Sequence, residues 1–295
     1  MSVVLQAVLS GLLTGGVYAM VSVGLTLIFG VMRIINFAHG DFVMLGMYAA
    51  VGLGVAAGLD PYVSVAVVGP GFFVLGMGVH ALVIRPLVRR GAPHTTQALA
   101  TLGLSVVIVS AVLLTASGRS VIATTGLTTA VVHVEGLVLS VTRLLAFAIA
   151  LVATGLLYLF LNHTYAGMAI RATAQDRKAA VLLGLPTERA DMVAFGLGIA
   201  CAAIAGAVMV PFFYVNPFVG QPLGLVAYIV VVLGGMGSMV GALVGGLAIG
   251  VTEALSGYLL DPGLKELVYL LLFVAALILM PSGLFGVRGA ERMAE

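Results

Sequence analysis

The formal charges of this chain are distributed very unevenly along its length. Seven of the 24 charged residues fall between Arg171 and Asp191. The 61 residues that follow, from Met192 to Thr252, contain no Asp, Glu, Lys, Arg or His. Long runs without an ionisable group suit the hydrocarbon core of a bilayer. The contrast predicts a membrane protein with one charged elbow between its spanning segments.

The composition supports this class and excludes others. Hydrophobic residues make up 62% of the 295 residues and charged residues 8%, with a mean hydropathy of +1.23. An average soluble domain has about 25% charged residues. The net charge of +2 is too small to indicate nucleic-acid binding, and Cys201 has no second cysteine for a disulfide or a thiolate metal site. We therefore expect residues 1–295 to form a single all-α transmembrane domain, with its first apolar run kept as a helix.

Nine apolar runs are candidate membrane spans. They cover residues 6–30, 41–58, 62–84, 97–116, 143–162, 191–211, 223–236, 239–260 and 265–281. Glycine and polar residues interrupt the pattern around Asn36 and around Gly234. Splitting or dropping one run there gives ten or eight spans, and this alternative stays open.

The basic residues indicate the orientation, because Lys and Arg accumulate in cytoplasmic loops. Placing the charged elbow inside puts ten of the thirteen basic residues in the cytoplasm and the amino terminus outside. Segment 163–190 is then a cytoplasmic loop. The ten inner residues are Arg33, Arg85, Arg89, Arg90, Arg171, Arg177, Lys178, Arg189, Arg288 and Arg292, which leaves Arg119, Arg143 and Lys265 outside.

Residues 117–142 form the one long external loop, with His133 and Glu135 near its middle. The alternation of residue types from Ala130 to Leu139 predicts a short hairpin. An irregular loop is the alternative. Either form is a candidate contact for a partner arriving from outside.

Small residues recur every four positions in several spans. This spacing places them on one helix face and lets neighbouring backbones approach closely in lipid. The stripes are Gly46, Ala50, Gly54 and Gly58; Gly198, Ala202 and Gly206; and Gly241 with Gly245. They predict a tightly packed helical bundle.

The first polar interruption runs from Ile34 to Asp41. Asn36, His39 and Asp41 are costly at membrane depth unless they face partners or a water-filled cavity, and Gly40 allows the backbone to turn. One interpretation is a discontinuous helix that lines a substrate passage, with Asn36, His39 and Gly40 on the pathway. The alternative is an ordinary interfacial loop in which Asp41 caps a helix.

The second interruption is the segment Gly234–Ser238. Three glycines within four residues disfavour a continuous helix, since each costs about 1 kcal/mol relative to alanine. Both interruptions lie at the inner ends of predicted spans, one in each half of the chain, as a duplicated transporter would place them. The second group of candidate pathway residues is Gly234, Gly235, Gly237 and Ser238.

The charged elbow contains a helix signal. Thr173 can cap a helix start, Asp176 complements the positive helix end, and Gly184 with Pro186 terminates the helix. This predicts a surface helix of about ten residues. Its apolar residues, Ala180 to Leu183, would be covered by a partner groove, or alternatively by the membrane domain itself.

Together these segments resemble the permease subunits of branched-chain amino acid ABC importers, the hydrophobic amino acid uptake family. The resemblance covers essentially the whole chain. Its most specific parts, taken in order and spacing, are Ile35–Gly40, Arg171–Gly184, Gly234–Ser238 with Gly241, and the ending Met280–Gly286. Where importer permeases usually show Glu-Ala-Ala in the elbow, this chain reads Ala-Thr-Ala from Ala172 to Ala174.

The resemblance implies a passive half-pore in the bacterial inner membrane, without a cofactor. Its implied partners are a second homologous permease, two cytosolic ABC ATPases, an external substrate-binding protein and membrane lipid. The elbow would be the coupling helix, and the implied ATPase-coupling residues are Arg171, Ala172, Asp176, Arg177, Gly184 and Leu185.

The residues themselves argue against an enzyme. The two lysines, Lys178 and Lys265, do not stand in a phosphate-binding loop, so ATP would be hydrolysed by another chain. Glu253 is the one ionisable residue well inside a predicted span, with either a gating or pathway role or a hydrogen-bonded structural role. A permease for urea or short amides, or a secondary transporter or channel, remains the alternative function.

Overall fold

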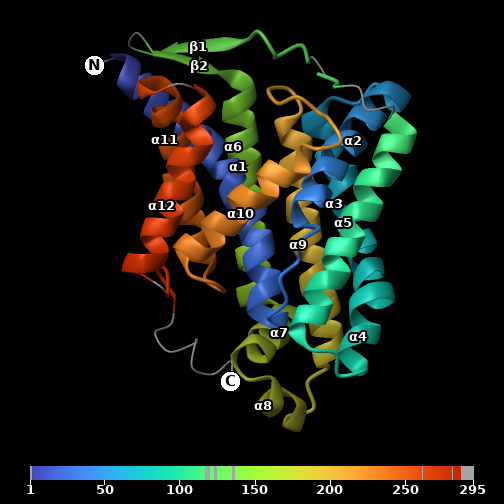
Figure 1. Ribbon diagram of the computed structural model, residues 1–295. Coiled ribbons are helices and arrows are strands. Elements are labelled where there is room, and N and C mark those ends of the chain that lie inside the picture. The colour runs from blue at the N-terminus through green and yellow to red at the C-terminus, as the bar shows by residue number, and fades with distance from the viewer. Residues whose placement is uncertain are drawn as a thin grey trace.

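Helices account for almost all regular structure in this protein (Figure 1). The computed structural model describes residues 2–116, 120–122, 125–134, 137–260, 262–280 and 282–286. The α-helices are α1 (Ser2–Met32), α2 (His39–Ala57), α3 (Pro61–Val79), α4 (Arg85–Arg89), α5 (His94–Ala116), α6 (Val141–His163), α7 (Tyr165–Gln175), α8 (Arg177–Leu182), α9 (Thr187–Met209), α10 (Gly220–Gly234), α11 (Met239–Leu259) and α12 (Lys265–Leu279). A π-helical turn, η1 (His80–Ile84), joins α3 to α4, a 3-10 turn, η2 (Pro262–Leu264), precedes α12, and the strands are β1 (Val131–Val134) and β2 (Leu137–Ser140).

Each of the nine predicted apolar runs is helical, which confirms the polytopic all-α bundle. Seven helical runs in the described residues are long and apolar enough to cross a membrane, including the continuous 29-residue run Pro61–Arg89. The two remaining runs form α10 and α12, of 15 residues each. A 15-residue helix is about 22 Å long, shorter than a hydrocarbon core of about 30 Å. Those two helices therefore cover only part of the membrane thickness.

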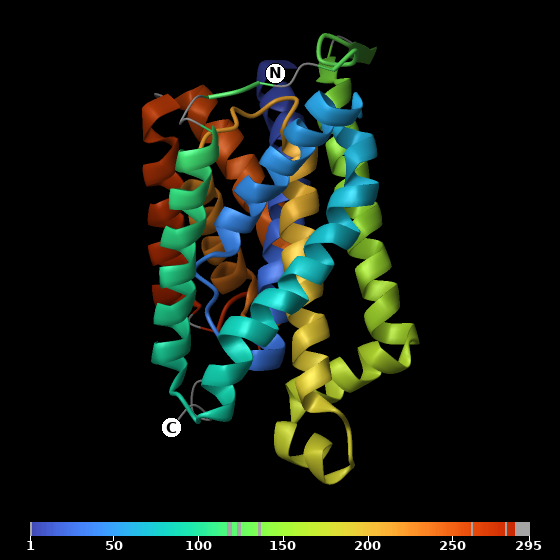
Figure 2. The ribbon, with the colours of Figure 1, turned by 90° about the vertical axis from the view of Figure 1, so that its right-hand side faces the viewer.

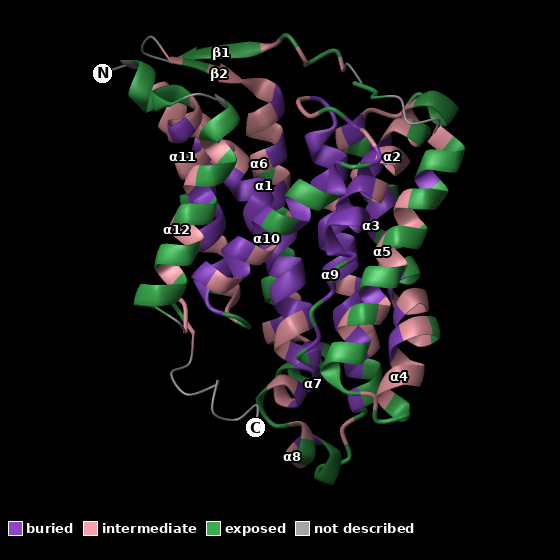
Figure 3. Ribbon diagram, viewed as in Figure 1, coloured by how far each residue is buried: buried purple, intermediate pink, exposed green. Residues whose placement is uncertain are grey.

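Helices α1 and α9 form the core of the bundle. In the most apolar 18-residue stretch of each helix, 83% of the residues are buried in α1 and 78% in α9, but only 17% in α5 and 22% in α6. Figure 3 shows buried residues concentrated along α1, α9 and α10, while α5 and α12 are largely exposed. Because α9 packs against α1, α2 and α3, it connects the two halves of the chain.

Glycine contacts set the close approach of these core helices. A Cβ atom at Gly198 in α9 would lie 2.6 Å from the Gly24 carbonyl oxygen of α1, and one at Gly46 in α2 would overlap the Ala203 backbone. The stripes on α9 and α11 are confirmed as packing faces. On α2 the prediction holds only for the first half of the stripe, because a Cβ at Gly58 would meet no atom within 4 Å.

The hairpin and the charged elbow lie at opposite ends of the bundle (Figure 1). Strands β1 and β2 pair antiparallel, which confirms the predicted hairpin. Gln6 of α1 holds it in place, because the Val138 N–H donates to Gln6 Oε1 at 2.9 Å and Gln6 Nε2 donates to the Val138 carbonyl. His133 lies in β1, whereas Arg119 and Glu135 of this loop lie outside the described residues, as do Arg288 and Arg292.

The glycine contact between α2 and α9 predicts a stability effect. Gly46→Val should lower the free energy of unfolding by about 1–3 kcal/mol, because the side chain would overlap the Ala203 backbone. Thermal unfolding in detergent measures this effect. Gly52→Val on the same helix is the matched control, since nothing lies within 4 Å of a Cβ there. Equal stability of the two variants would contradict the packing.

Candidate translocation and coupling sites

The first interruption is a non-helical segment that turns back into the bundle. Helix α1 ends at Met32, followed by Arg33 in the left-handed region with φ of 55°. Residues 33–38 then run back along α1, so that His39 at the start of α2 donates from Nε2 to the Val21 carbonyl at 3.0 Å. Val21 precedes Met32 by eleven residues, or about 16 Å of helix. Helix α2 therefore begins deep inside the bundle.

The backbone of this half-buried segment is held by side chains from two other helices. The Phe37 N–H donates to Thr101 Oγ1 of α5 at 3.0 Å, and the same hydroxyl lies 3.2 Å from the Ile35 carbonyl. The Tyr228 hydroxyl of α10 donates to the Asn36 carbonyl. These contacts satisfy polar backbone groups that lipid could not.

The side chain of Asn36, in contrast, is left without partners. Its relative exposure is 0%, and neither Oδ1 nor Nδ2 has a hydrogen-bond partner within the described residues. The Nδ1 atom of the fully buried His39 is also unpartnered there. An unpaired buried amide costs about 1–3 kcal/mol. The interfacial-loop alternative is therefore wrong, because these polar residues lie in the interior. Asp41 does not cap α2 either, since Ala38 occupies the N-cap position and Asp41 lies within the first turn.

The start of α2 meets the start of α10. A Cβ at Gly40 would overlap the Gly220 carbonyl oxygen and lie 2.8 Å from the Gly224 Cα. Asp41 Oδ1 lies 2.8 Å from the position of a Cβ at Gly220, so the carboxylate sits at the amino end of α10. A carboxylate is stabilised at that end of a helix by the unpaired N–H groups.

The second interruption lies at the other end of α10. Gly235 and Gly237 have φ of 99° and 89°, and Ser238 caps α11 by accepting from the Gly241 N–H at 3.0 Å. A Cβ at Gly30, near the end of α1, would lie 3.3 Å from the Gly237 Cα, so the two backbones are close. The break is confirmed, but its residues stand apart from Asn36, His39 and Gly40.

The carboxyl-terminal segment covers this second break. Leu284 N–H donates to the Leu233 carbonyl at 2.9 Å and Phe285 N–H to the Gly234 carbonyl at 3.0 Å. A Cβ at Gly235 would meet the backbone of Gly286. Close backbone packing therefore explains Gly235, and it explains Gly234 as well because a Cβ there would overlap the Gly241 backbone of α11.

The elbow contains two short helices instead of the one predicted. Thr173 lies inside α7 and its hydroxyl donates to the Ala169 carbonyl at 2.7 Å, so it caps nothing. Asp176 is the cap, since its Oδ1 accepts from the Ala179 N–H at 3.0 Å. The surface helix, α8, has six residues and not about ten, and Gly184 with φ of 75° follows its end.

The apolar residues of the elbow divide between the bundle and the surface. Ala180 is buried, whereas Val181, Leu182 and Leu183 are 56%, 88% and 78% exposed. Figure 2 shows α8 projecting beyond the ends of the other helices. The membrane domain itself therefore does not cover these three side chains.

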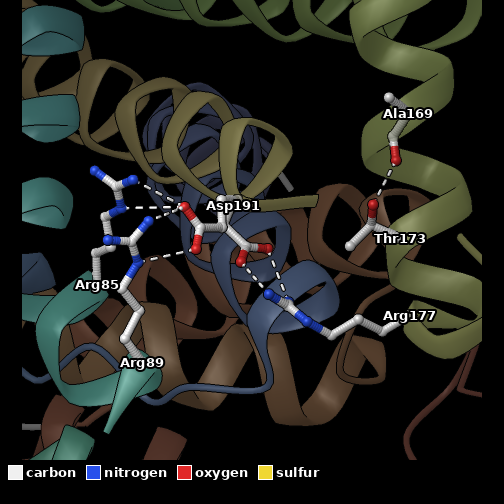
Figure 4. A network of polar contacts seen from close by, with 7 residues as sticks. Arg85, Arg89, Ala169, Thr173, Arg177 and Asp191 are labelled. Carbon is white, nitrogen blue, oxygen red and sulfur yellow. Dashed lines mark hydrogen bonds and ion pairs between the residues drawn. The ribbon is translucent and has the colours of Figure 1, made fainter. Parts of the chain in front are cut away.

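Two groups of ion pairs connect the elbow to the bundle (Figure 4). Arg177 forms a bidentate pair with Asp191 of α9, with N–O distances of 3.0 and 2.5 Å, and the Asp191 side chain is 4% exposed. One turn earlier, Glu188 accepts from both Arg85 and Arg89 of α4 at 2.9 to 3.2 Å. Sequence reasoning missed this network, because Arg85 and Arg89 lie 103 and 99 residues from Glu188 along the chain.

The remaining predicted coupling residues lie around this network. Arg171, Asp176 and Gly184 are exposed, and Ala172 and Leu185 are half-buried. Glu253 in α11 is paired with Lys265 at the start of α12, with 3.1 Å between Oε1 and Nζ. This ion pair gives Glu253 a structural contact between α11 and α12.

Comparison with known proteins agrees with this geometry. The sequence profile of the family described as branched-chain amino acid transport system permease component matches residues 7–277. The chain belongs to this family. It is a multi-pass protein of the inner membrane and a transport subunit, not an enzyme. The predicted resemblance is thereby confirmed.

Three relatives show how far the likeness extends. The high-affinity branched-chain amino acid transport system permease protein LivH of Escherichia coli K12 is 33% identical over 98% of this chain and 97% of its own length. BraD of Pseudomonas aeruginosa, with the same description, is 31% identical over 98% of both chains. The probable branched-chain amino acid transport permease protein LivH of Methanocaldococcus jannaschii is 28% identical over 91% of this chain and 88% of its own. No solved structure matches the chain.

The pair formed by Arg177 and Asp191 predicts non-additive stability effects. Arg177→Ala should lower the free energy of unfolding by about 1–3 kcal/mol because it leaves a buried carboxylate unpaired, and Asp191→Ala should cost less because Arg177 is half-exposed. The double variant should lose clearly less than the sum of the two. Thermal unfolding in detergent gives the values, and Lys178→Ala, an exposed neighbour, is the control. Strict additivity would show that the two residues do not interact.

Proposed function

We propose that this protein is the membrane-embedded subunit of an ABC importer and carries a branched-chain or other small hydrophobic amino acid inward. Its partners would be a second homologous permease, two cytosolic ABC ATPases and an external substrate-binding protein. The full-length likeness to permeases named for branched-chain amino acids supports the substrate class. Nothing in the fold favours urea or short amides over amino acids.

The observation that carries the coupling role is the exposed apolar face of α8. Val181, Leu182 and Leu183 are exposed on and just after α8, and α8 lies at the end of the bundle that carries α4 and is assigned to the cytoplasm by the basic residues (Figure 1). Three adjacent apolar side chains in water are unfavourable, and a groove on an ATPase would cover them. The exposed ends of Arg171 and Asp176 would contact the rim of that groove.

The ion pairs behind α8 would transmit the motion of the ATPase. Arg177 holds α8 to the buried Asp191 of α9, and Glu188 of α9 holds α4. Because α9 packs along α1, α2 and α3, a displacement of α8 reaches the helices on either side of the non-helical segment.

The substrate pathway is proposed to run beside residues 33–38. Asn36 and His39 offer unpaired polar atoms in an otherwise apolar interior, and irregular backbone is tolerated at this depth where it borders a cavity. Gly40 allows the close contact of α2 with α10. The second group, Gly234, Gly235, Gly237 and Ser238, would form the inner end of the same route.

An exposed position on α8 provides the test of coupling. Leu182→Asp should leave the unfolding temperature unchanged, because this side chain makes few contacts within the chain, yet it should abolish co-purification of the ATPases and ATP-dependent leucine uptake. Val132→Asp in the hairpin, at the opposite end, is the matched control and should retain ATPase binding. Normal ATPase recovery and normal uptake with Leu182→Asp would reject the coupling role of α8.

A further inference from the structure

A second polar site lies at the hairpin end of the bundle, toward the ends of α1 and α11 that are remote from the two interruptions. A partly open pocket of about 170 Å³ lies between α1, α6, α11 and α12. Its polar lining includes Thr14, Tyr18, Arg143, Glu253 and Lys265. Glu253 lies six residues before the end of α11, about 9 Å into the helix. The pocket is therefore in the outer half of the membrane in the proposed orientation.

Only one oxygen of the Glu253 carboxylate is paired within the described residues. The Oε1 atom pairs with Lys265 Nζ at 3.1 Å, whereas Oε2 is buried and has no hydrogen-bond partner within the described residues. The Glu253 side chain is 16% exposed. An unpaired buried carboxylate oxygen is unfavourable, and an ammonium group is the partner that suits it best.

Arg143 supplies the complementary charge. Its guanidinium lies 5.9 Å from the centre of the Phe212 ring, and no carboxylate of the described residues forms an ion pair with it. The lining residues thus carry two cations, Arg143 and Lys265, and one carboxylate. A guanidinium binds a carboxylate through two parallel hydrogen bonds, so the excess positive charge favours an anionic group.

We propose that this pocket binds a small zwitterionic amino acid, with its ammonium on the Glu253 carboxylate and its carboxylate on Arg143. The inference rests on the proposed function for the choice of an amino acid as ligand. Ser10, Thr14 and the ring of Phe213 complete the lining and would contact the remainder of the molecule. The pocket would hold the substrate on the outer side before it reaches the route beside residues 33–38. Arg143, Glu253 and Lys265 would then be binding residues of the permease itself.

Binding of matched ligands to the purified complex tests this assignment. L-Leucine would be compared with 4-methylpentanoate, which lacks the ammonium, and with isoamylamine, which lacks the carboxylate. The complex would be kept in detergent with phosphatidylcholine, and binding measured by calorimetric titration. Arg143→Gln should weaken L-leucine about 10- to 100-fold and leave isoamylamine unchanged. Glu253→Gln should weaken L-leucine and leave 4-methylpentanoate unchanged.

Lys178→Gln is the matched control, because it removes an exposed cation at the opposite end of the bundle, and it should bind L-leucine like the parent. Arg143→Gln keeps the pair of Glu253 and Lys265, so it should fold normally, and its unfolding temperature checks this. Unchanged L-leucine affinity in Arg143→Gln would overturn the assignment. Displacement of L-leucine by phosphatidylethanolamine, with binding of that lipid lost in both variants, would identify a lipid-headgroup site and would also overturn it.

Uptake measurements keep the two proposals distinguishable. If the parent complex takes up L-leucine with ATP but Arg143→Gln binds and transports it equally well, this pocket assignment fails while the proposed function stands. If the parent complex transports no amino acid, the proposed function fails whatever the pocket binds.

Discussion

The structure depends on satisfying the backbone of one non-helical segment inside a membrane. Residues 33–38 run along α1 with Ile34, Asn36 and Ala38 buried and the alternating Arg33, Ile35 and Phe37 exposed, at a depth where lipid offers no partner for their peptide groups. Thr101 and Tyr228 provide the hydrogen bonds to this segment, which fixes α5 and α10 beside it. The contact of Gly40 with Gly220 then places the start of α10 against the start of α2. The pairing of this backbone therefore explains why α2 and α10 both begin inside the bundle and meet there.

Helix α9 links that interior to the charged end. Its carboxyl-terminal half packs against α1 and α2 through glycine contacts, which leave little room for independent movement. Its first turns carry Glu188 and Asp191, which bind α4 and α8. The same helix thus joins the exposed apolar surface to the buried polar segment. This arrangement gives a physical route by which an ATPase could change the environment of Asn36.

The sequence was sufficient for the fold class, all nine apolar runs, both interruptions and the hairpin, because lipid requires long apolar helices and glycine disfavours them. It was not sufficient for the contacts. The cap of α8 is Asp176 and not Thr173, since either residue suits a cap and only the burial of Thr173 in α7 decides. Arg177 was predicted as an ATPase contact, but the structure pairs it with Asp191, fourteen residues away. Tyr228, some 190 residues from Asn36, could not be paired with it by local pattern.

The unpaired amide of Asn36 is expected to serve the passage of substrate and not the stability of the fold. ATP-dependent leucine uptake by an Asn36→Leu complex in liposomes tests this most directly. Replacing an unpartnered buried amide with an apolar side chain of similar size should keep or raise the unfolding temperature and retain the ATPases. We expect uptake to fall at least about tenfold in this intact complex, a barrier increase of about 1.4 kcal/mol. Uptake at the parental rate would contradict a role for Asn36 in the pathway.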